Sequence, residues 1–326
     1  MEQDKLLDVR ELSVRFHTRE GVVHAVNNVN FTLNRGEILA LVGESGCGKS
    51  VTANTIMGLI GKKKHEEVKG TVTFHGEELL EKTERQMQKI RGNRIAMIFQ
   101  DPMTSLDPVM QVGIQVGEVL EIHKHLKKQA ALRQAVEMLS KVGIPSAGER
   151  AKDYPYQFSG GMRQRSIIAS SLMCSPELLI ADEPTTALDV TIQAQILKLL
   201  AELRTQMNVT ILLITHDLGV VAEVCDRVAV MYAGEIVESA PVETLFKKPC
   251  HPYTRGLLKC LPILGSRERL EPIPGQPPKL VNPPKGCKFK ERCKYACGGC
   301  DKAQCLSEAE PGHMVACWKW RECDGQ

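Results

Sequence analysis

The sequence predicts an α/β fold in which helices alternate with the strands of a mostly parallel sheet. Four short apolar runs have the length and composition of buried strands: residues 37–42, 94–99, 178–181 and 209–214. Between them, apolar residues recur at helical spacing in residues 112–142 and 192–203. A glycine-rich turn follows the first run, and a helix is predicted to start at residues 50–60. Strands that alternate with helices in this way indicate a largely parallel sheet.

Length and composition indicate a globular chain with one large domain and an appendage. The chain has 326 residues, of which 43% are hydrophobic and 25% are charged. Its net charge is +3, and basic residues are interspersed with acids, which argues against nucleic acid as a partner. No stretch approaches the ~18 apolar residues of a membrane helix, and the charged N-terminus does not fit a signal peptide. We therefore expect a cytoplasmic protein that reaches a membrane only by docking onto another subunit.

A phosphate-binding loop is the clearest chemical motif. Residues 43–50, Gly-Glu-Ser-Gly-Cys-Gly-Lys-Ser, fit the P-loop pattern G-x-x-x-x-G-K-S/T between a predicted strand and a predicted helix. Glycines allow a tight turn whose backbone N–H groups face phosphate oxygens, and the helix N-terminus adds a favourable dipole. We expect Lys49 to bind the β- and γ-phosphates of ATP and Ser50 to bind Mg²⁺. The predicted nucleotide contacts are Gly43, Glu44, Ser45, Gly46, Cys47, Gly48, Lys49, Ser50 and Val51.

Two acids follow the third apolar run directly. Asp182 is expected to hold Mg²⁺, either directly or through water. Glu183 is expected to orient and polarise the attacking water as a general base. Because these acids end a strand downstream of a P-loop, they predict hydrolysis of ATP as well as its binding.

A third motif lies between these two, at the predicted start of a helix. Residues 158–164 read Phe-Ser-Gly-Gly-Met-Arg-Gln, and a serine before two glycines at a helix start forms an anion-binding turn. The segment resembles the signature motif of ABC ATPases, whose usual form is Leu-Ser-Gly-Gly-Gln. This chain departs from that form at Phe158 and Met162. The core that contacts phosphate is intact: Ser159, Gly160 and Gly161.

Further markers of ABC ATPases follow in the family's order over residues 10–240. Gln100 resembles the Q-loop glutamine, residues 187–189 resemble the D-loop, and His216 resembles the switch histidine. Phe16 lies where the family places an aromatic ring that stacks on adenine. The catalytic residues that this resemblance implies are Glu183, His216 and Gln100, and the Mg²⁺ ligands are Ser50, Gln100 and Asp182.

The resemblance also implies an architecture and a dimer. The expected fold is a P-loop NTPase of the ABC cassette type, with a mixed central sheet and a helical subdomain at about residues 100–175. It occupies a nucleotide-binding domain of residues 1–245. Two homologous subunits would close head to tail, so that the P-loop of one and the signature motif of the other enclose each ATP. ATP binding would close this dimer and hydrolysis would reopen it.

Two longer segments resemble the ATPases of peptide and nickel importers. They are residues 99–108, Phe-Gln-Asp-Pro-Met-Thr-Ser-Leu-Asp-Pro, and residues 248–257, which contain His-Pro-Tyr. The partners implied are a second ATPase subunit, two transmembrane permease subunits and, indirectly, an extracytoplasmic peptide-binding protein. The implied location is the cytoplasmic face of the cell membrane. The implied cargo is a dipeptide or oligopeptide, with nickel or another small solute as the alternative.

The chain has 12 cysteines, and many of them crowd its C-terminal end: Cys287, Cys293, Cys297, Cys300, Cys305, Cys317 and Cys323. Because disulfides are not expected in a reducing compartment, this crowding indicates a metal site in a Pro- and Cys-rich region, residues 246–326. Thiolates without a flanking His pair suit a [4Fe-4S] cluster or zinc, with free or oxidised thiols as the remaining alternative. Only Cys297 and Cys300 have the C-x2-C spacing of zinc sites. The peptide-importer resemblance implies the [4Fe-4S] ligands Cys287, Cys293, Cys300 and Cys317.

Two hypotheses concern individual cysteines. The metal is expected to hold together a proline-rich tail that is too short for its own core, so loss of Cys293 should unfold the tail and leave ATP binding intact. Cys47 in the P-loop fills a position that suits a small residue, with a thiol activated by Lys49 as the alternative.

Other classes of protein fit fewer features. A soluble ABC ATPase that acts on nucleic acid or cluster assembly usually has two cassettes or basic insertions, and neither is present. A non-enzymatic regulatory subunit would lack Lys49, Glu183 or His216, and all three are present. A third interpretation makes the cysteine tail an electron-transfer module. The sequence favours an ATP-hydrolysing transporter subunit.

Overall fold

The computed structural model describes residues 4–100, 105–186, 188–261 and 272–321. The chain forms two compact units. The first unit combines the two ends of the chain, Met1–Leu80 and Ile214–Gln326, and the second unit is the segment between them, Glu81–Leu213.

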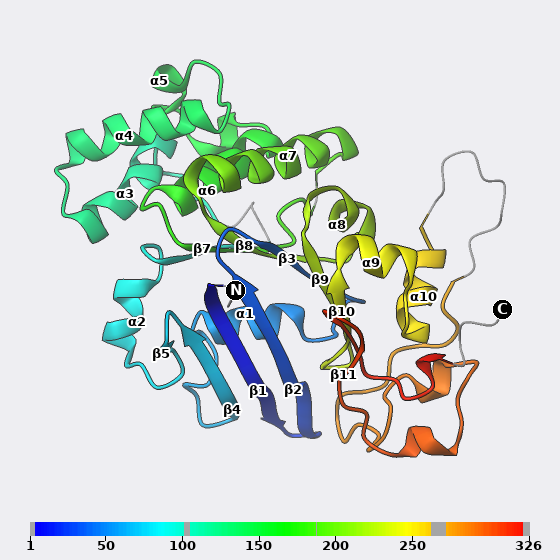
Figure 1. Ribbon diagram of the computed structural model, residues 1–326. Coiled ribbons are helices and arrows are strands. Elements are labelled where there is room, and N and C mark those ends of the chain that lie inside the picture. Colours follow the sequence, from blue (N-terminus) through cyan, green and yellow to red (C-terminus); the bar gives the residue numbers. More distant parts are fainter. Residues whose placement is uncertain (1–3, 101–104, 187, 262–271, 322–326) are drawn as a thin grey trace. The chain divides into compact units, whose positions relative to one another are not determined.

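An antiparallel sheet begins the first unit, with the strand order β2-β1-β4-β5 (Figure 1). Its strands are β1 (Lys5–Thr18), β2 (Gly21–Asn34), β4 (Glu66–Phe74) and β5 (Glu77–Glu78). β1 pairs with β2 from Thr18 opposite Gly21 back to Lys5 opposite Asn34, so the two strands form a long hairpin. Phe16 lies near the turn of this hairpin, opposite Val23.

A second group of strands in the first unit carries both the P-loop and the C-terminal residues. β3 (Ile38–Val42) pairs in parallel with β9 (Arg227–Tyr232). Antiparallel pairing then continues from β9 to β10 (Glu235–Pro241), from β10 to β12 (His313–Val315), and from β12 to β11 (Ser307–Glu310). The cysteine-rich tail therefore extends the sheet that carries the P-loop, which the sequence had not predicted.

The helices of the first unit are short. They are α1 (Lys49–Ile56), α8 (Leu218–Val224), α9 (Val242–Lys247) and α10 (Pro252–Lys259), with 3-10 turns at Lys290–Arg292 and Gly298–Asp301. Three aromatic rings join these parts in one core: the ring centroids of Tyr232 and Tyr253 lie 4.5 Å apart, and Phe289 lies 5.3 Å from Tyr232 and 5.4 Å from Tyr253. Cys287 and Cys293 pack against this core. The aromatic cluster thus connects the sheet, α10 and the first cysteines of the tail.

The second unit has the strand order β8-β7-β6. It also has a group of helices (Figure 1). β6 (Ile95–Ile98) is parallel to β7 (Leu178–Asp182). β8 (Thr210–Thr215) begins in this unit, and its last two residues belong to the first unit. The helices are α2 (Glu84–Ile90), α3 (Val112–Lys124), α4 (Lys128–Lys141), α5 (Ala147–Arg150), α6 (Gly160–Leu172) and α7 (Val190–Met207), with a 3-10 turn at Pro155–Gln157. The four predicted buried strands are confirmed as β3, β6, β7 and β8.

The single helical pattern predicted over residues 112–142 is two helices, α3 and α4. His125 ends α3 in the left-handed conformation, with φ of 54°, so the chain turns between them. A Cβ added to Gly117 would lie 3.1 Å from the Ala131 carbonyl. This glycine lets the two helices pack closely.

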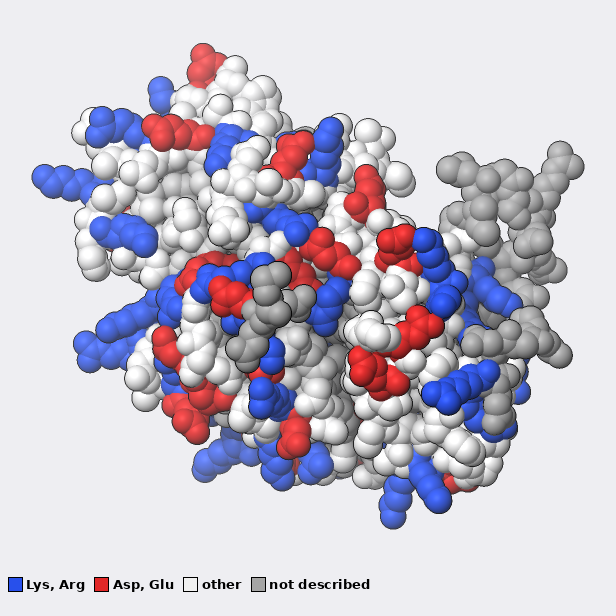
Figure 2. Space-filling model, in the orientation of Figure 1, with Lys and Arg blue, Asp and Glu red and all other residues white. Residues whose placement is uncertain are grey.

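Within the described part of the chain, no helix is long and apolar enough to cross a membrane. On the face drawn in Figure 2, Lys and Arg side chains are interspersed with Asp and Glu side chains over much of the surface.

Candidate functional site

The P-loop joins β3 to α1 in a conformation that only glycine adopts easily. Gly43, Gly46 and Gly48 have φ of 154°, 77° and 108°. A Cβ on Gly43 would lie 2.1 Å from the Met231 carbonyl oxygen, and one on Gly48 would lie 2.5 Å from that of Ala25. Both the dihedral angle and the space therefore require glycine at two of the three positions.

Lys49 is buried inside this loop, with only 5% of its surface exposed. Its Nζ donates to the carbonyl oxygens of Gly43 at 2.7 Å and Glu44 at 3.1 Å, and lies 3.8 Å from Cys47 Sγ. These partners are neutral, so the charge of the ammonium is not cancelled by them. A buried cation with neutral partners favours the approach of an anion, which agrees with the predicted phosphate contact.

The Cys47 thiol is also buried. Burial raises its pKa above the ordinary value, and the nearby Lys49 offsets this only in part. A thiol with a raised pKa has little nucleophilic thiolate. The structure therefore supports a small structural residue at this position rather than an activated cysteine.

Glu44 connects the P-loop to residues from the C-terminal part of the chain. Its backbone N–H donates to Tyr253 Oη at 3.0 Å, and its carboxylate accepts two hydrogen bonds from Arg292, at 2.8 and 3.0 Å. The Arg292 side chain is 6% exposed. Such bidentate, charge-assisted pairs are strong and geometrically specific. The sequence placed Glu44 only among the phosphate contacts and missed this pair, because its members are 248 residues apart.

In the second unit, the two predicted acids lie where β7 ends. Asp182 is its last residue and is 3% exposed. Glu183 follows with φ of 47°, a left-handed conformation that costs a residue with a side chain ~1–3 kcal/mol and is common at active sites. Its Oε2 accepts hydrogen bonds from Gln100 Nε2 at 3.2 Å and Thr186 Oγ1 at 2.9 Å. The structure thus brings together two predicted catalytic residues and adds Thr186, which the sequence had not indicated.

The signature motif opens α6, as predicted. Ser159 is the N-cap, and its Oγ accepts from the Met162 N–H at 3.3 Å. Ser159 and Gly160 are exposed, whereas Gly161 is buried where a Cβ would lie 2.8 Å from Ile192 Cγ2 of α7. The exposed start of the helix can present its backbone N–H groups to a phosphate.

The remaining predicted residues are divided between the units. Phe16 is half-buried and His216 is exposed just after β8; both belong to the first unit with the P-loop. In the D-loop, Asp189 caps α7 by accepting from the Ile192 N–H at 2.9 Å. Ala187, residues 101–104 of the importer motif, and Cys323 lie outside the described residues.

Three of the four predicted cluster ligands lie near one another. The backbone N–H of Cys287 donates to the Cys300 carbonyl at 2.8 Å. Burial and the neighbouring thiols of Cys300 and Cys293 raise the pKa of Cys287 to about 11. A bound cation would reverse this effect, because it stabilises thiolates.

Cys317, the fourth predicted ligand, directly precedes Trp318, which packs against the segment of Cys300. A Cβ on Gly299 would lie 2.2 Å from the Trp318 ring. This close packing connects the two turns that carry Cys300 and Cys317. The four predicted ligands therefore all lie in one part of the first unit.

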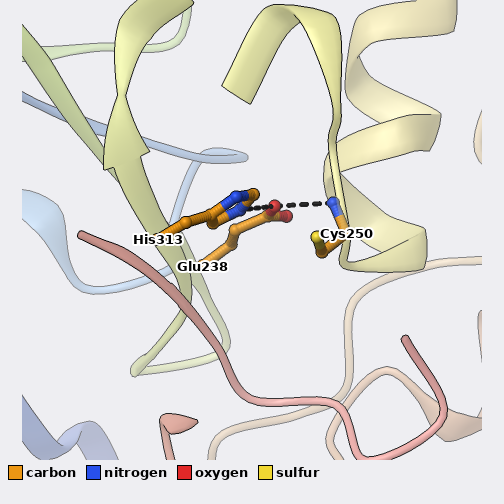
Figure 3. Close-up of side chains that lie close together, drawn as sticks. All are labelled: Glu238, Cys250 and His313. Atoms are coloured by element: carbon orange, nitrogen blue, oxygen red, sulfur yellow. Dashed lines mark hydrogen bonds and ion pairs between the residues drawn. The ribbon is translucent and has the colours of Figure 1, made fainter. Parts of the chain in front are cut away.

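A separate group of buried side chains, the Glu238 cluster, contains Glu238, Cys250 and His313 (Figure 3). His313 Nε2 lies 2.7 Å from Glu238 Oε1, which also accepts from the Cys250 N–H at 2.6 Å, and Oε2 accepts from the His251 N–H at 2.8 Å. Two ligands of one tetrahedral zinc ion would lie ~3.3 Å apart, which is farther than the 2.7 Å between His313 Nε2 and Glu238 Oε1. Because both carboxylate oxygens already accept backbone hydrogen bonds, we assign this cluster a structural role.

Comparison with known families decides the class of protein. The family described as "ABC transporter" matches residues 26–186, and "Oligopeptide/dipeptide transporter, C-terminal region" matches residues 237–300. A probable peptide ABC transporter ATP-binding protein, y4tR of Sinorhizobium fredii, is 55% identical over 98% of this chain and 96% of its own length. The chain belongs to the ABC transporter ATPases. Its predicted ATP hydrolysis, coupled to transport, is confirmed.

Two further comparisons describe this ABC transporter ATPase. The dipeptide transport ATP-binding protein DppD of Lactococcus lactis is 53% identical over 98% of this chain and 92% of its own length. A solved dimer of the ATP-binding cassette MJ0796, bound to ADP and phosphate, covers 72% of this chain and 98% of its own, with 26% identity and a TM-score of 0.65. The predicted ABC cassette fold is therefore confirmed.

Proposed function

We propose that this ABC transporter ATPase powers the import of dipeptides or oligopeptides. The observation that carries the proposal is the nearly full-length similarity to peptide and dipeptide transport ATPases, which includes their C-terminal region. The His-Pro-Tyr segment of that region is built into the core: His251 Nδ1 caps α10 by accepting from the Tyr253 N–H at 3.1 Å. Tyr253 in turn holds Glu44 of the P-loop.

In this proposal, residues of this chain bind the phosphates, hold Mg²⁺ and orient the attacking water. Lys49 binds the transferred phosphate, and Ser50, Gln100 and Asp182 would hold the Mg²⁺ that neutralises phosphate charge. Glu183 orients the attacking water, with its carboxylate fixed by Gln100 and Thr186.

A homologous second ATPase subunit supplies the opposing signature motif, and two permease subunits form the membrane path. An extracytoplasmic peptide-binding protein delivers the cargo. This arrangement places the chain at the cytoplasmic face of the cell membrane.

Reconstitution into liposomes with the permease subunits, partner ATPase and binding protein tests the cargo. We expect ATP-dependent accumulation of a labelled dipeptide or oligopeptide, abolished by Glu183→Gln. Vesicles with the Glu183→Gln subunit are the matched control for leakage. Uptake of nickel but not of peptides would replace the peptide proposal with the nickel alternative.

We further propose that residues 246–326 hold a [4Fe-4S] cluster through Cys287, Cys293, Cys300 and Cys317. Cys287 and Cys293 pack against the same hydrophobic core, and the Cys287 N–H donates to the Cys300 carbonyl at 2.8 Å. Among the described residues, the Glu238 cluster is the one group whose three potential ligand atoms all lie within 4.8 Å of one another. Zn–S bonds of ~2.3 Å place thiolates ~3.8 Å apart, and the Sγ atoms of Cys297 and Cys300 lie 3.9 Å apart, so zinc is the alternative to the cluster.

Anaerobic purification with iron, sulfide and zinc analysis tests the cluster. We expect about four irons and four sulfides per chain, as [4Fe-4S] requires, with visible absorption that Cys293→Ser abolishes. Cys305→Ser, at an exposed cysteine outside the proposed set, is the matched control. One zinc per chain without colour contradicts the cluster and supports zinc.

A further inference from the structure

Arg292 connects the proposed metal site to the P-loop. It ends the 3-10 turn Lys290–Arg292, which lies between Cys287 and Cys293 in the sequence, and directly precedes Cys293. Its two terminal nitrogens bind the Glu44 carboxylate at 2.8 and 3.0 Å. One residue therefore joins the backbone of the cysteine site to an acid inside the phosphate-binding loop.

The position of Arg292 is fixed on several sides. Its Nε donates to the Pro274 carbonyl at 2.8 Å, and Nη1 lies 3.3 Å from Tyr232 Oη. The guanidinium also lies 5.7 Å from the centroid of the Tyr232 ring and 5.8 Å from that of Phe289. These contacts place the charge against Glu44, provided that the turn before Cys293 keeps its shape.

Glu44 is an unusual neighbour for a phosphate site because its carboxylate carries the same charge as the ligand. Its side chain is 25% exposed, so water screens its charge only in part. Arg292 neutralises this charge. The Glu44 carbonyl meanwhile accepts from Lys49 Nζ at 3.1 Å, so a shift of Glu44 also displaces the phosphate-binding lysine.

We propose that Arg292 is a positioning residue of the nucleotide site, and that occupancy of the cysteine site sets ATP affinity by holding Arg292 against Glu44. The dependence of ATP affinity on the cysteine site rests on the metal site proposed above. By linkage, a metal that strengthens ATP binding is itself retained more strongly when ATP is bound. The contact is at odds with the expectation that loss of Cys293 leaves ATP binding intact.

A double-mutant cycle that removes charges, the charge-removal cycle, tests the positioning role of Arg292. The dissociation constant of a fluorescent ATP analogue is measured in full-length protein carrying Glu183→Gln, which stops hydrolysis. Arg292→Gln should raise this constant by about 5- to 150-fold, the usual range of coupling between sites. Glu44→Gln alone is measured to complete the cycle, and adding Glu44→Gln to Arg292→Gln should restore most of the affinity lost in Arg292→Gln, because the unpaired acid is gone.

Lys290→Gln is the matched control. It removes a positive charge two residues from Arg292 that pairs with Asp301 rather than with the P-loop. It should leave the affinity unchanged. Unaltered affinity in Arg292→Gln overturns the positioning role, and so does a double variant as weak as Arg292→Gln, because a purely structural loss is not rescued by removing the acid.

Removal of the metal tests whether occupancy of the cysteine site sets ATP affinity. Iron is extracted with a chelator, its loss is followed by absorbance, and nucleotide affinity is measured again. We expect weaker binding in the parent protein, a clearly smaller weakening in the Arg292→Gln, Glu44→Gln double variant, and slower iron extraction when the ATP analogue is bound. Affinity that does not respond to extraction overturns the coupling while leaving the cluster standing. Protein purified without any metal removes both the cluster and the coupling, whereas the charge-removal cycle still decides the role of Arg292.

Discussion

Replacing His313 by alanine should release the C-terminal strands β11 and β12 from β10. His313 is 1% exposed and its partner Glu238 is 0% exposed, so their contact is made without water. His313 Nδ1 has no hydrogen-bond partner among the described residues, so the hydrogen bonding of the ring comes from Nε2. The Ala316 N–H, which donates to the Val237 carbonyl at 2.8 Å, reports whether β12 stays attached.

The magnitude follows from the charges involved. The Cys250 thiol and the Glu238 carboxylate raise the pKa of His313 from 6.5 to about 10, which corresponds to a ceiling of ~5 kcal/mol. Removing one partner of a buried ion pair typically costs ~3–5 kcal/mol. Glu238 keeps two backbone N–H donors in the variant, so we expect the lower end, ~3 kcal/mol, or a roughly 150-fold rise in opening.

Hydrogen exchange of peptides that cover residues 307–316 measures this opening at pH 7. His17→Ala is the matched control: His17 pairs with Glu67 at 3.3 Å, but on the surface, where such a pair contributes little. A change of less than about fivefold in His313→Ala would refute the assigned role of the buried pair.

The pH dependence has a defined sign. Because folding raises the pKa of His313, its stabilisation is complete below pH 6.5 and is lost as the pH rises through about 10. His313→Ala should lack this loss between the two values. Equal pH dependence in wild type and variant contradicts the pairing.

Three further predictions concern the nucleotide site. Glu183→Gln should slow single-turnover ATP hydrolysis by about 10²- to 10⁴-fold while the ATP dissociation constant stays nearly unchanged; a loss of binding instead would contradict its role as base. Phe16→Ala should weaken ATP binding by ~1–3 kcal/mol, measured by titration, because a stacked base is lost. Gly48→Ala should abolish ATP binding, since its Cβ would lie 2.5 Å from the Ala25 carbonyl. Gly46→Ala, which meets nothing within 4 Å, should bind measurably and is the control.

The parts of the site that could be predicted are those encoded by local pattern. The run at residues 178–181 is apolar throughout because β7 is buried on both faces, and the acids after it could be placed at the end of a strand. The P-loop could be predicted because its glycines satisfy backbone geometry within eight residues. In both cases the cause lies inside the segment.

The contacts that could not be predicted join distant segments. Glu238 and His313 are 75 residues apart, and neither has neighbours that indicate a buried partner. β12 has three residues, too few for any alternation of apolar and polar positions to appear. The break at His125 was missed because the apolar stripe continues across it, and a left-handed residue leaves no mark on periodicity.

The tail shares a hydrophobic core with the strands of the ATPase, so it is an integral part of that unit and not a separate appendage. Val42 of β3, Tyr232 of β9, Tyr253 of α10 and Phe289 of the tail are all buried in one cluster, against which Cys287 packs. A change in the tail therefore reaches β3, and the P-loop that follows it, through packed side chains as well as through Arg292. A close-packed core has few voids that could absorb a displacement, so side chains in contact transmit it to one another. Loss of the proposed metal should accordingly weaken nucleotide binding more than Arg292→Gln alone, because it would disturb both routes.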